Sequence, residues 1–218
     1  MDKTPSPLSL AAALALPLPE GRRSSEVFVD GDLEIRLYAP KGHDPQTPHD
    51  RDELYVVASG RGKFRVGERV ERFTPGSLLY VAAHETHRFE DFSDDFATWV
   101  VFYGAVKTPP AVGRTGLHIS PEAARALKPP PDRASAEAFV DGDVEVRFAA
   151  PATRGMQVPH ERDEFYIVAT GNGRYRIDDA EVAIGAGDLL FAAAHAEHGF
   201  VERSDDFSEW IVFYGPAK

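Results

Sequence analysis

The chain contains an internal repeat at an offset of 111 residues, and this repeat limits the possible folds more than any other feature of the sequence. Residues 8–104 align with residues 119–215 without a gap, and 47 of the 97 aligned positions are identical. Identity spread over the length of a whole domain indicates a duplicated domain rather than convergence. The sequence therefore predicts two domains of one fold, residues 1–106 and residues 107–218.

Length and composition agree with two small globular domains. A chain of 218 residues has room for two domains of about a hundred residues each. The absence of cysteine excludes disulfides and thiolate metal ligands, and it fits a reducing compartment such as the cytoplasm. A net charge of −11 repels phosphate backbones and anionic lipid, and no apolar run reaches the roughly 18 residues of a membrane span. We expect a cytoplasmic protein that binds neither nucleic acid nor membranes.

A short segment rich in alanine and leucine begins each repeat. Residues 8–16 (LSLAAALAL) resemble the apolar part of a secretory signal, but their counterpart, residues 119–127, lies in mid-chain and cannot be a cleaved leader. That counterpart contains Ser120, Pro121 and Glu122, which are typical of a helix start: an N-cap, a proline at the first helical position and an acid in the first turn. We expect both segments to form short helices that lead into their domains.

Short β-rich runs separated by turn residues fill the rest of each repeat. Leu33, Ile35 and Leu37 alternate with charged residues, which is the pattern of a half-buried strand. Asp30 and Gly31 form a hairpin signal, and runs such as LYVV and WVVFY are bounded by glycine. Apart from the two lead-in segments, the sequence predicts an all-β protein whose domains are sandwiches or barrels.

The histidines indicate where the chemistry lies. His49 and Glu53 are four residues apart, and the proline before them and the β-rich run after them argue against a helix. In a hairpin closed by residues 50–52, the two side chains would face each other about 5 Å apart and could share a metal ion. His87, from another strand, would complete a facial triad of two histidines and one carboxylate with open positions for water or substrate.

The second repeat carries the same three residue types, at His160, Glu164 and His198. The alternative interpretation of each pair is an ordinary hydrogen bond or salt bridge at the surface, which contributes little to stability. Because duplicated domains share residues by ancestry, the recurrence is not independent support for a metal. It does show that polar groups on inward-facing strands were kept while much of the surface changed.

These residues resemble the motifs of a bicupin, a protein with two cupin domains in tandem. The first cupin motif joins histidine to a glutamate that is followed by glycine, as in His49, Glu53 and Gly60. The second motif runs from a glycine to a histidine eleven residues later, as from Gly76 to His87, and both motifs recur in the second repeat. The resemblance implies a double-stranded β-helix barrel in each repeat, with one divalent transition metal, Fe, Mn, Ni or Zn, bound at its mouth.

The sequence departs from the family pattern at several positions. The first motif normally has an additional histidine, which would fall at Thr47 and Val158, so we expect three-ligand sites. Gln46 and Gln157 lie one position earlier and are possible further ligands, although strict strand alternation would point them away. In the turn of the second motif, a histidine stands where the family usually has glycine. We expect these two histidines, His84 and His195, to cap or pack in the turn.

Aromatic residues provide candidates for a pocket lining. Tyr55 and Tyr166 have the same strand parity as the two glutamates, whereas Trp99 and Trp210 lie on the last strand of each repeat. An aromatic lining suits a small organic molecule, although aromatic residues in a β core are also ordinary packing.

Two functions remain open at this point. The first is a metal-dependent cupin enzyme acting on a small organic molecule, with dioxygenase, decarboxylase or isomerase chemistry. The second is a non-catalytic barrel that binds or stores a small molecule, with a structural metal or none. An enzyme should have an open metal position facing a cavity, whereas a structural site should be closed. Either a monomer whose repeats pack as a pseudo-dimer or a homodimer fits the duplication.

Overall fold

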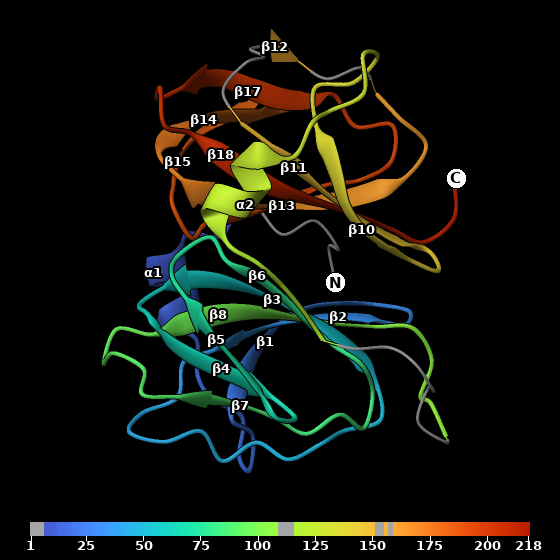
Figure 1. Ribbon diagram of the computed structural model, residues 1–218. Coiled ribbons are helices and arrows are strands. Elements are labelled where there is room, and N and C mark those ends of the chain that lie inside the picture. The colour runs from blue at the N-terminus through green and yellow to red at the C-terminus, as the bar shows by residue number, and fades with distance from the viewer. Residues whose placement is uncertain (1–6, 109–115, 151–154, 157–158) are drawn as a thin grey trace. The chain divides into compact units, whose positions relative to one another are not determined.

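The computed structural model describes residues 7–108, 116–150, 155–156 and 159–218, and the fold in this part of the chain is almost entirely β (Figure 1). Contacts divide it into two compact units. One unit comprises Ala11–Pro121, and the other comprises Glu122–Lys218 with the described residues up to Leu10. The predicted all-β class is confirmed.

Each repeat contains a short helix and a series of short strands. The elements of the first repeat are α1 (Leu10–Leu14), β1 (Ser24–Asp30), β2 (Leu33–Tyr38), β3 (Asp52–Ser59), β4 (Gly62–Val66), β5 (Arg69–Phe73), β6 (Leu78–Val81), β7 (His87–Glu90) and β8 (Ala97–Tyr103). Those of the second repeat are β9 (Leu117–Ile119), α2 (Pro121–Ala126), β10 (Ala136–Asp141), β11 (Val144–Ala149), β12 (Gly155–Met156), β13 (Asp163–Thr170), β14 (Asn172–Ile177), β15 (Ala180–Gly185), β16 (Leu189–Ala192), β17 (His198–Arg203) and β18 (Ser208–Tyr214). Helix α2 starts at Pro121 with Glu122 in its first turn, as predicted.

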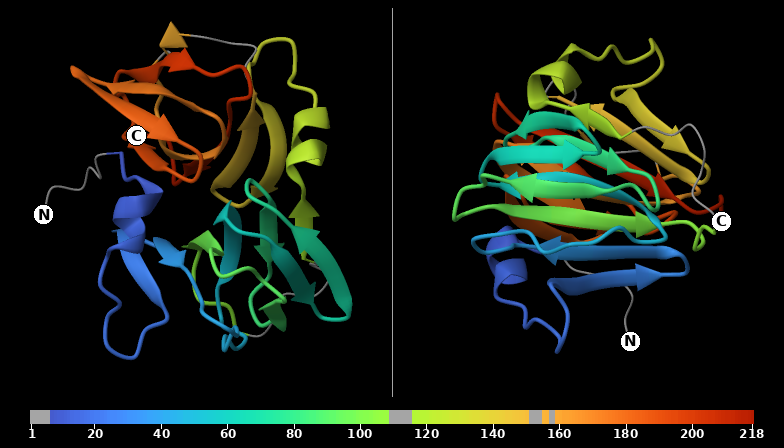
Figure 2. Two further views of the ribbon diagram at one scale, coloured as in Figure 1. Left: turned by 90° about the vertical axis from the view of Figure 1, so that its left-hand side faces the viewer. Right: turned by 60° about the horizontal axis from the view of Figure 1, so that its bottom comes forward.

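Two antiparallel sheets form the barrel of each repeat, and their strands can be followed in the two turned views of Figure 2. The first repeat has a six-stranded sheet of order β1-β2-β8-β3-β6-β9 and a three-stranded sheet of order β5-β4-β7. The second has a five-stranded sheet, β10-β11-β18-β13-β16, and a four-stranded sheet, β12-β17-β14-β15. This arrangement confirms the predicted double-stranded barrels.

Apolar side chains fill the interior of each barrel. In the first repeat, Tyr55 on β3 and Val100 on β8 are directly paired and face inward, toward Phe64 and Phe89 of the other sheet. The second repeat has the same arrangement around Tyr166. Because alternate residues of a strand face opposite sides, these pairs define which positions of β3 and β8 reach the interior.

The lead-in segments pair across the repeats. Strand β9 pairs with β6, with Ile119 opposite Leu78. Leu8 forms an isolated bridge with Leu189 of β16, with backbone hydrogen bonds of 2.8 and 3.0 Å. Leu8 is equivalent to Ile119 in the repeat, and Leu189 is equivalent to Leu78, so the same pairing occurs twice. The domain boundary between residues 106 and 107 stays a prediction.

Neither of the helices that the structure describes has the length and apolar character needed to cross a bilayer.

Candidate metal sites

Glu53 and the two histidines reach one point from different parts of the first repeat. Glu53 is the second residue of β3, and His87 begins β7 in the other sheet. His49 precedes β3 in an irregular segment, so the expected hairpin does not form. Pro45 and Pro48 flank this segment and have no N–H group to donate to a strand ladder, which accounts for its irregular path.

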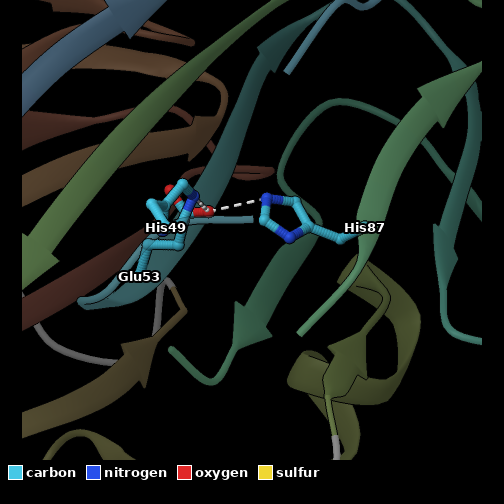
Figure 3. Close-up of side chains that lie close together, drawn as sticks. All are labelled: His49, Glu53 and His87. Carbon is cyan, nitrogen blue, oxygen red and sulfur yellow. Dashed lines mark ion pairs between the residues drawn. The ribbon is translucent and has the colours of Figure 1, made fainter. Parts of the chain in front are cut away.

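The three side chains meet at one carboxylate oxygen. Figure 3 shows His87 pointing at the Glu53 carboxylate from a separate strand, with His49 beside it. Oε1 of Glu53 lies 2.5 Å from Nε2 of His49 and 2.8 Å from Nε2 of His87. The hydroxyl of Tyr55 donates to the same oxygen at 2.6 Å. The three predicted ligand atoms all lie within 4.8 Å of one another.

One ring nitrogen of His87 binds the backbone, which leaves the other to face the site. Its Nδ1 lies 2.7 Å from the carbonyl oxygen of Glu85, which can only accept, so Nδ1 carries a proton. Nε2 is therefore the ring nitrogen that faces the carboxylate oxygen of Glu53, where it holds either a proton shared with that oxygen or a metal ion. A divalent cation can take the place of that proton, because imidazole and carboxylate are both ligands for divalent transition metals. The residues therefore fit a metal.

The side chains of the first site shift one another's pKa values. Burial acts to raise the pKa of Glu53, but hydrogen bonds from His49 and His87 outweigh burial and hold that pKa below its usual range. Burial acts to lower the pKa of His49, and the hydrogen bond to Glu53 outweighs it and raises that pKa. Burial, and then the charge of Glu53, raise the pKa of Tyr55, which stays a neutral donor. Glu53 is thus a buried anion, and its Oε2 has no hydrogen-bond partner among the described residues.

The second repeat reproduces this site. Oε1 of Glu164 lies 2.8 Å from Nε2 of His160 and 2.5 Å from Nε2 of His198. Tyr166 donates to the same oxygen. Nδ1 of His198 lies 2.8 Å from the carbonyl oxygen of Ala196, so Nε2 is again the nitrogen that faces the glutamate. Burial acts to raise the pKa of Glu164, and the hydrogen bonds from His160, His198 and Tyr166 lower it below its usual value.

The turn after β6 holds His49 in place. The backbone N–H of His84 donates to the carbonyl of His49 at 2.6 Å, and Nε2 of His84 lies 2.5 Å from the carbonyl oxygen of Lys107. His84 adopts a φ of 68°, in the left-handed region that favours the glycine it replaces. It packs in the turn and is not one of the grouped ligands. The same contacts in the second repeat involve His160, His195 and Lys218.

An ion pair between a buried aspartate and a more exposed lysine lies behind each site and was not predicted. Nζ of Lys107 pairs with the fully buried carboxylate of Asp52, whose other oxygen accepts the N–H of Ala83 at 2.8 Å. The pair ties the segment after β8 to the turn that positions His49. Lys218 and Asp163 form the equivalent pair. Lys107 and Lys218 are related by the repeat offset, and this recurrence was the sequence feature that could have predicted the pair.

A pocket with a volume of about 220 Å³ opens beside the first site. Its polar lining includes Arg23, Tyr38 and Gln46, and its apolar lining includes Val100 and Phe102. Tyr55 also lines it. Sequence reasoning did not identify Arg23 or Tyr38, because neither recurs in the second repeat.

Several expected site residues lie elsewhere. Trp99 is fully buried but pairs with Val56, on the opposite face of the sheet from Val100 and Tyr55, so it does not line this pocket. Trp210 has the same strand position, and its ring packs on Phe148 at 4.7 Å. The alternation of residues along β8 explains the difference, because Trp99 and Phe102 have opposite parity.

The structure describes Gln46 but not Gln157. Oε1 of Gln46 lies 3.3 Å from the hydroxyl of Tyr55, at the edge of the first site. A role of Gln46 as a fourth ligand stays a prediction. Gln157 lies outside the described residues, as does Val158.

Comparisons with known proteins identify the family of each repeat. The family model of the cupin domain matches twice, at residues 35–103 and 144–214. An uncharacterized protein of Streptomyces coelicolor, SCO3923, is 42% identical over 73 residues, which are 33% of this chain and 70% of that protein.

Similar solved structures have the same fold at low sequence identity. A cupin 2 conserved barrel domain protein from Leptotrichia buccalis superposes with a TM-score of 0.68 at 13% identity and covers 97% of both chains. A salicylate 1,2-dioxygenase from Pseudaminobacter salicylatoxidans has a TM-score of 0.69 at 13% identity, covering 98% of this chain and 86% of its own. The chain belongs to the cupin family, with one cupin domain in each repeat.

Proposed function

We propose that the protein is a metal-dependent cupin enzyme that acts on a small organic molecule, with one divalent transition metal in each barrel. The observation that supports this most directly is the convergence of Nε2 of His49 and Nε2 of His87 on one buried oxygen of Glu53, at 2.5 and 2.8 Å. The same arrangement recurs at His198 and Glu164. Because each carboxylate is buried and keeps one oxygen without a hydrogen-bond partner among the described residues, a metal ion bound there would balance its charge.

In the first barrel, His49, Glu53 and His87 would hold the metal and leave positions open toward the pocket. A metal bound there supplies a Lewis acid that stabilises negative charge as it develops on a substrate. Glu85 fixes the orientation of His87, and Tyr55 donates its hydroxyl hydrogen to Glu53. The pocket walls hold the organic part of the substrate and exclude water from it.

The reaction class belongs to the proposal. Dioxygenation, decarboxylation and isomerisation all use a metal to stabilise an anionic species, and the structural neighbour named as a salicylate 1,2-dioxygenase is an example of the first. We also propose a cytoplasmic location, which the absence of cysteine fits.

Metal analysis of the full chain, purified without chelator or affinity tag, tests the two sites. We expect two transition-metal ions per chain, one in His49→Ala, one in His160→Ala and none in the double variant. Protein that holds no metal, and takes up none on reconstitution with Fe, Mn, Ni or Zn, would contradict the proposal and favour a metal-free binding barrel.

Water relaxation separates an enzyme site from a closed structural site. We expect Mn²⁺-loaded protein to enhance the relaxation of solvent protons, because an open position exchanges its water. In His160→Ala, which keeps the site beside the pocket, the enhancement should persist. Bound Mn²⁺ without any enhancement would show a closed site and overturn the catalytic part of the proposal.

A further inference from the structure

We propose that the pocket of the first barrel takes a small organic carboxylate, whose anionic end is bound by Arg23 and Gln46. This deepens the proposed function by naming a substrate class for the site next to His49. It also assigns different ligands to the two barrels, because the second repeat has Ala134 at the position of Arg23.

Arg23 provides the positive charge at the pocket. It immediately precedes β1, lines the pocket, and donates through one guanidinium nitrogen to the carbonyl oxygen of Pro45. A guanidinium has five N–H donors in a planar fork, so this anchor leaves donors for a carboxylate. Arg51, another arginine in the segment that forms the site, is already engaged with the Gly104 carbonyl and the Glu34 carboxylate.

Gln46 provides a neutral donor deeper in the pocket. Its Oε1 faces the hydroxyl of Tyr55, and its Nε2 is buried without a hydrogen-bond partner among the described residues. A buried amide N–H without an acceptor is costly, and a ligand oxygen in the pocket would satisfy it. Because Nε2 can only donate, the complementary group on the ligand is an acceptor.

A buried carboxylate fixes this donor set. Asp44 accepts the hydroxyl of Tyr38 at 2.5 Å and the backbone N–H groups of Gln46 at 3.0 Å and Phe89 at 2.8 Å. These three groups all donate hydrogen bonds to Asp44, which thereby holds Tyr38 and the backbone of Gln46 in place at the pocket. The wall is therefore preorganised before a ligand arrives, which lowers the entropy cost of binding.

The remaining features of the pocket define the rest of the ligand. Val100 and Phe102 offer an apolar surface for a short chain or a single ring, and the volume of about 220 Å³ limits its size. Arg23 and Gln46 together present the donors of an oxyanion-binding edge, and Val100 and Phe102 present the apolar surface. A small molecule with one carboxylate and an apolar body matches both surfaces.

The second repeat lacks this edge. Ala134 stands at the position of Arg23, Ala149 at that of Tyr38, and Gly155 at that of Asp44. The metal-site residues and the glutamine are shared, whereas the arginine and Asp44 are not. We therefore expect one Arg23-dependent carboxylate site per chain, in the first barrel.

Calorimetry with matched acid–amide pairs tests this assignment. The probes are benzoate against benzamide and butyrate against butyramide, titrated into the full chain both treated with chelator and loaded with Zn²⁺. Each acid should bind at least about tenfold more tightly than its amide, with close to one site per chain, since one charge-assisted hydrogen bond accounts for that ratio. In Arg23→Ala the preference should disappear, and in Arg23→Lys it should be partly retained.

Arg22→Ala is the matched control, because it makes the same charge change one residue away and Arg22 does not line the pocket. We expect it to keep the full preference. If neither acid exceeds its amide in the unaltered protein, or if Arg23→Ala keeps the preference, the inference is wrong. Metal counts on the same samples separate the two proposals: bound metal without acid preference overturns only the carboxylate site, and Arg23-dependent preference without metal uptake overturns only the metal-enzyme function.

Discussion

Glu209 is a buried carboxyl group in the second barrel, where the first barrel has Thr98. Its Oε1 lies 3.4 Å from the guanidinium of Arg203, which stacks over the ring of Phe200 at 4.4 Å. Burial raises the pKa of Glu209 to about 8, against the lowering effect of Arg203. Folding therefore favours the protonated form of this carboxyl group at neutral pH.

This residue makes stability depend on pH. In the unfolded chain the pKa of Glu209 returns to 4.5. Below that pH the carboxyl group is protonated in both the folded and the unfolded state, and its contribution to folding stability is at its maximum. Between about 4.5 and 8 the folded state alone binds the proton, and stability falls as pH rises through this range. The total loss is on the order of 3 to 5 kcal/mol.

The double variant Arg203→Phe with Glu209→Thr restores the residues of the first barrel and serves as the matched comparison. Its unfolding free energy, measured by urea titration of chelator-treated protein at pH 6 and pH 9, should fall less between these values than that of the unaltered chain. The difference isolates Glu209, because the histidines and Glu164 are common to both proteins. Equal falls in the two proteins would show that Glu209 does not carry this dependence.

At the residue scale, repetition and spacing predicted the two triads, because His49, Glu53 and His87 recur together. They did not predict Arg23 or Asp44, which lie in parts of the first repeat without equivalent residue types in the second. The position of Trp99 was available from the sequence, since its strand parity is opposite to that of Phe102. The segment around Asp44 is irregular, so no periodic pattern of apolar and polar residues predicts the contacts that it makes.

At the scale of elements, the glycine of the first cupin motif has a packing role. Gly60 follows β3 with a φ of 76°, and a Cβ there would lie 2.5 Å from Cα of Phe96. Gly67, between β4 and β5, has a φ of 57° and nothing within 4 Å of such a Cβ. Adding a side chain at Gly67 therefore costs only the strain of a left-handed backbone, whereas at Gly60 it also causes a clash with the backbone of Phe96.

We expect Gly67→Ala to lower the unfolding free energy by about 1 kcal/mol, the cost of a left-handed alanine. Gly60→Ala should lower it by more than about 3 kcal/mol, because the Cα of Phe96 cannot move without disturbing the strand that follows it. Urea denaturation followed by tryptophan fluorescence measures both. Similar losses in the two variants would mean that the contact with Phe96 is relieved at little cost.

Element prediction succeeded where the pattern was periodic. The hairpin at Asp30 and Gly31, the strands and the helix at Pro121 all carry local signals that the structure confirms. The expected hairpin between His49 and Glu53 failed because the proximity of these residues is set by tertiary contacts. The backbone N–H of His84, from a distant turn, holds the carbonyl of His49, and such a contact leaves no mark in the spacing of nearby residues.

At the scale of the whole molecule, the lead-in segment of each repeat adds to a sheet of the other. Strand β9 pairs with β6, and β6 in turn pairs with β3, where Val81 lies opposite Glu53. A boundary between residues 106 and 107 would remove β9 from the first barrel. It would leave an unpaired edge on β6, one strand away from the candidate metal site.

Fragments of the first barrel test where the folding unit ends. We expect fragment 11–121, which contains β9, to exceed fragment 1–106 in unfolding free energy by about 1 to 2 kcal/mol, from three cross-strand residue pairs and the covered edge. Fragment 11–116 is the control, because it has the longer connection but lacks β9, and it should exceed fragment 1–106 only by the contribution of the contacts of Lys107 with Asp52 and His84. Urea titrations of all three at equal concentration give the comparison. If fragments 11–116 and 11–121 unfold at the same urea concentration, β9 does not stabilise the barrel, and the boundary at residue 106 would serve equally well.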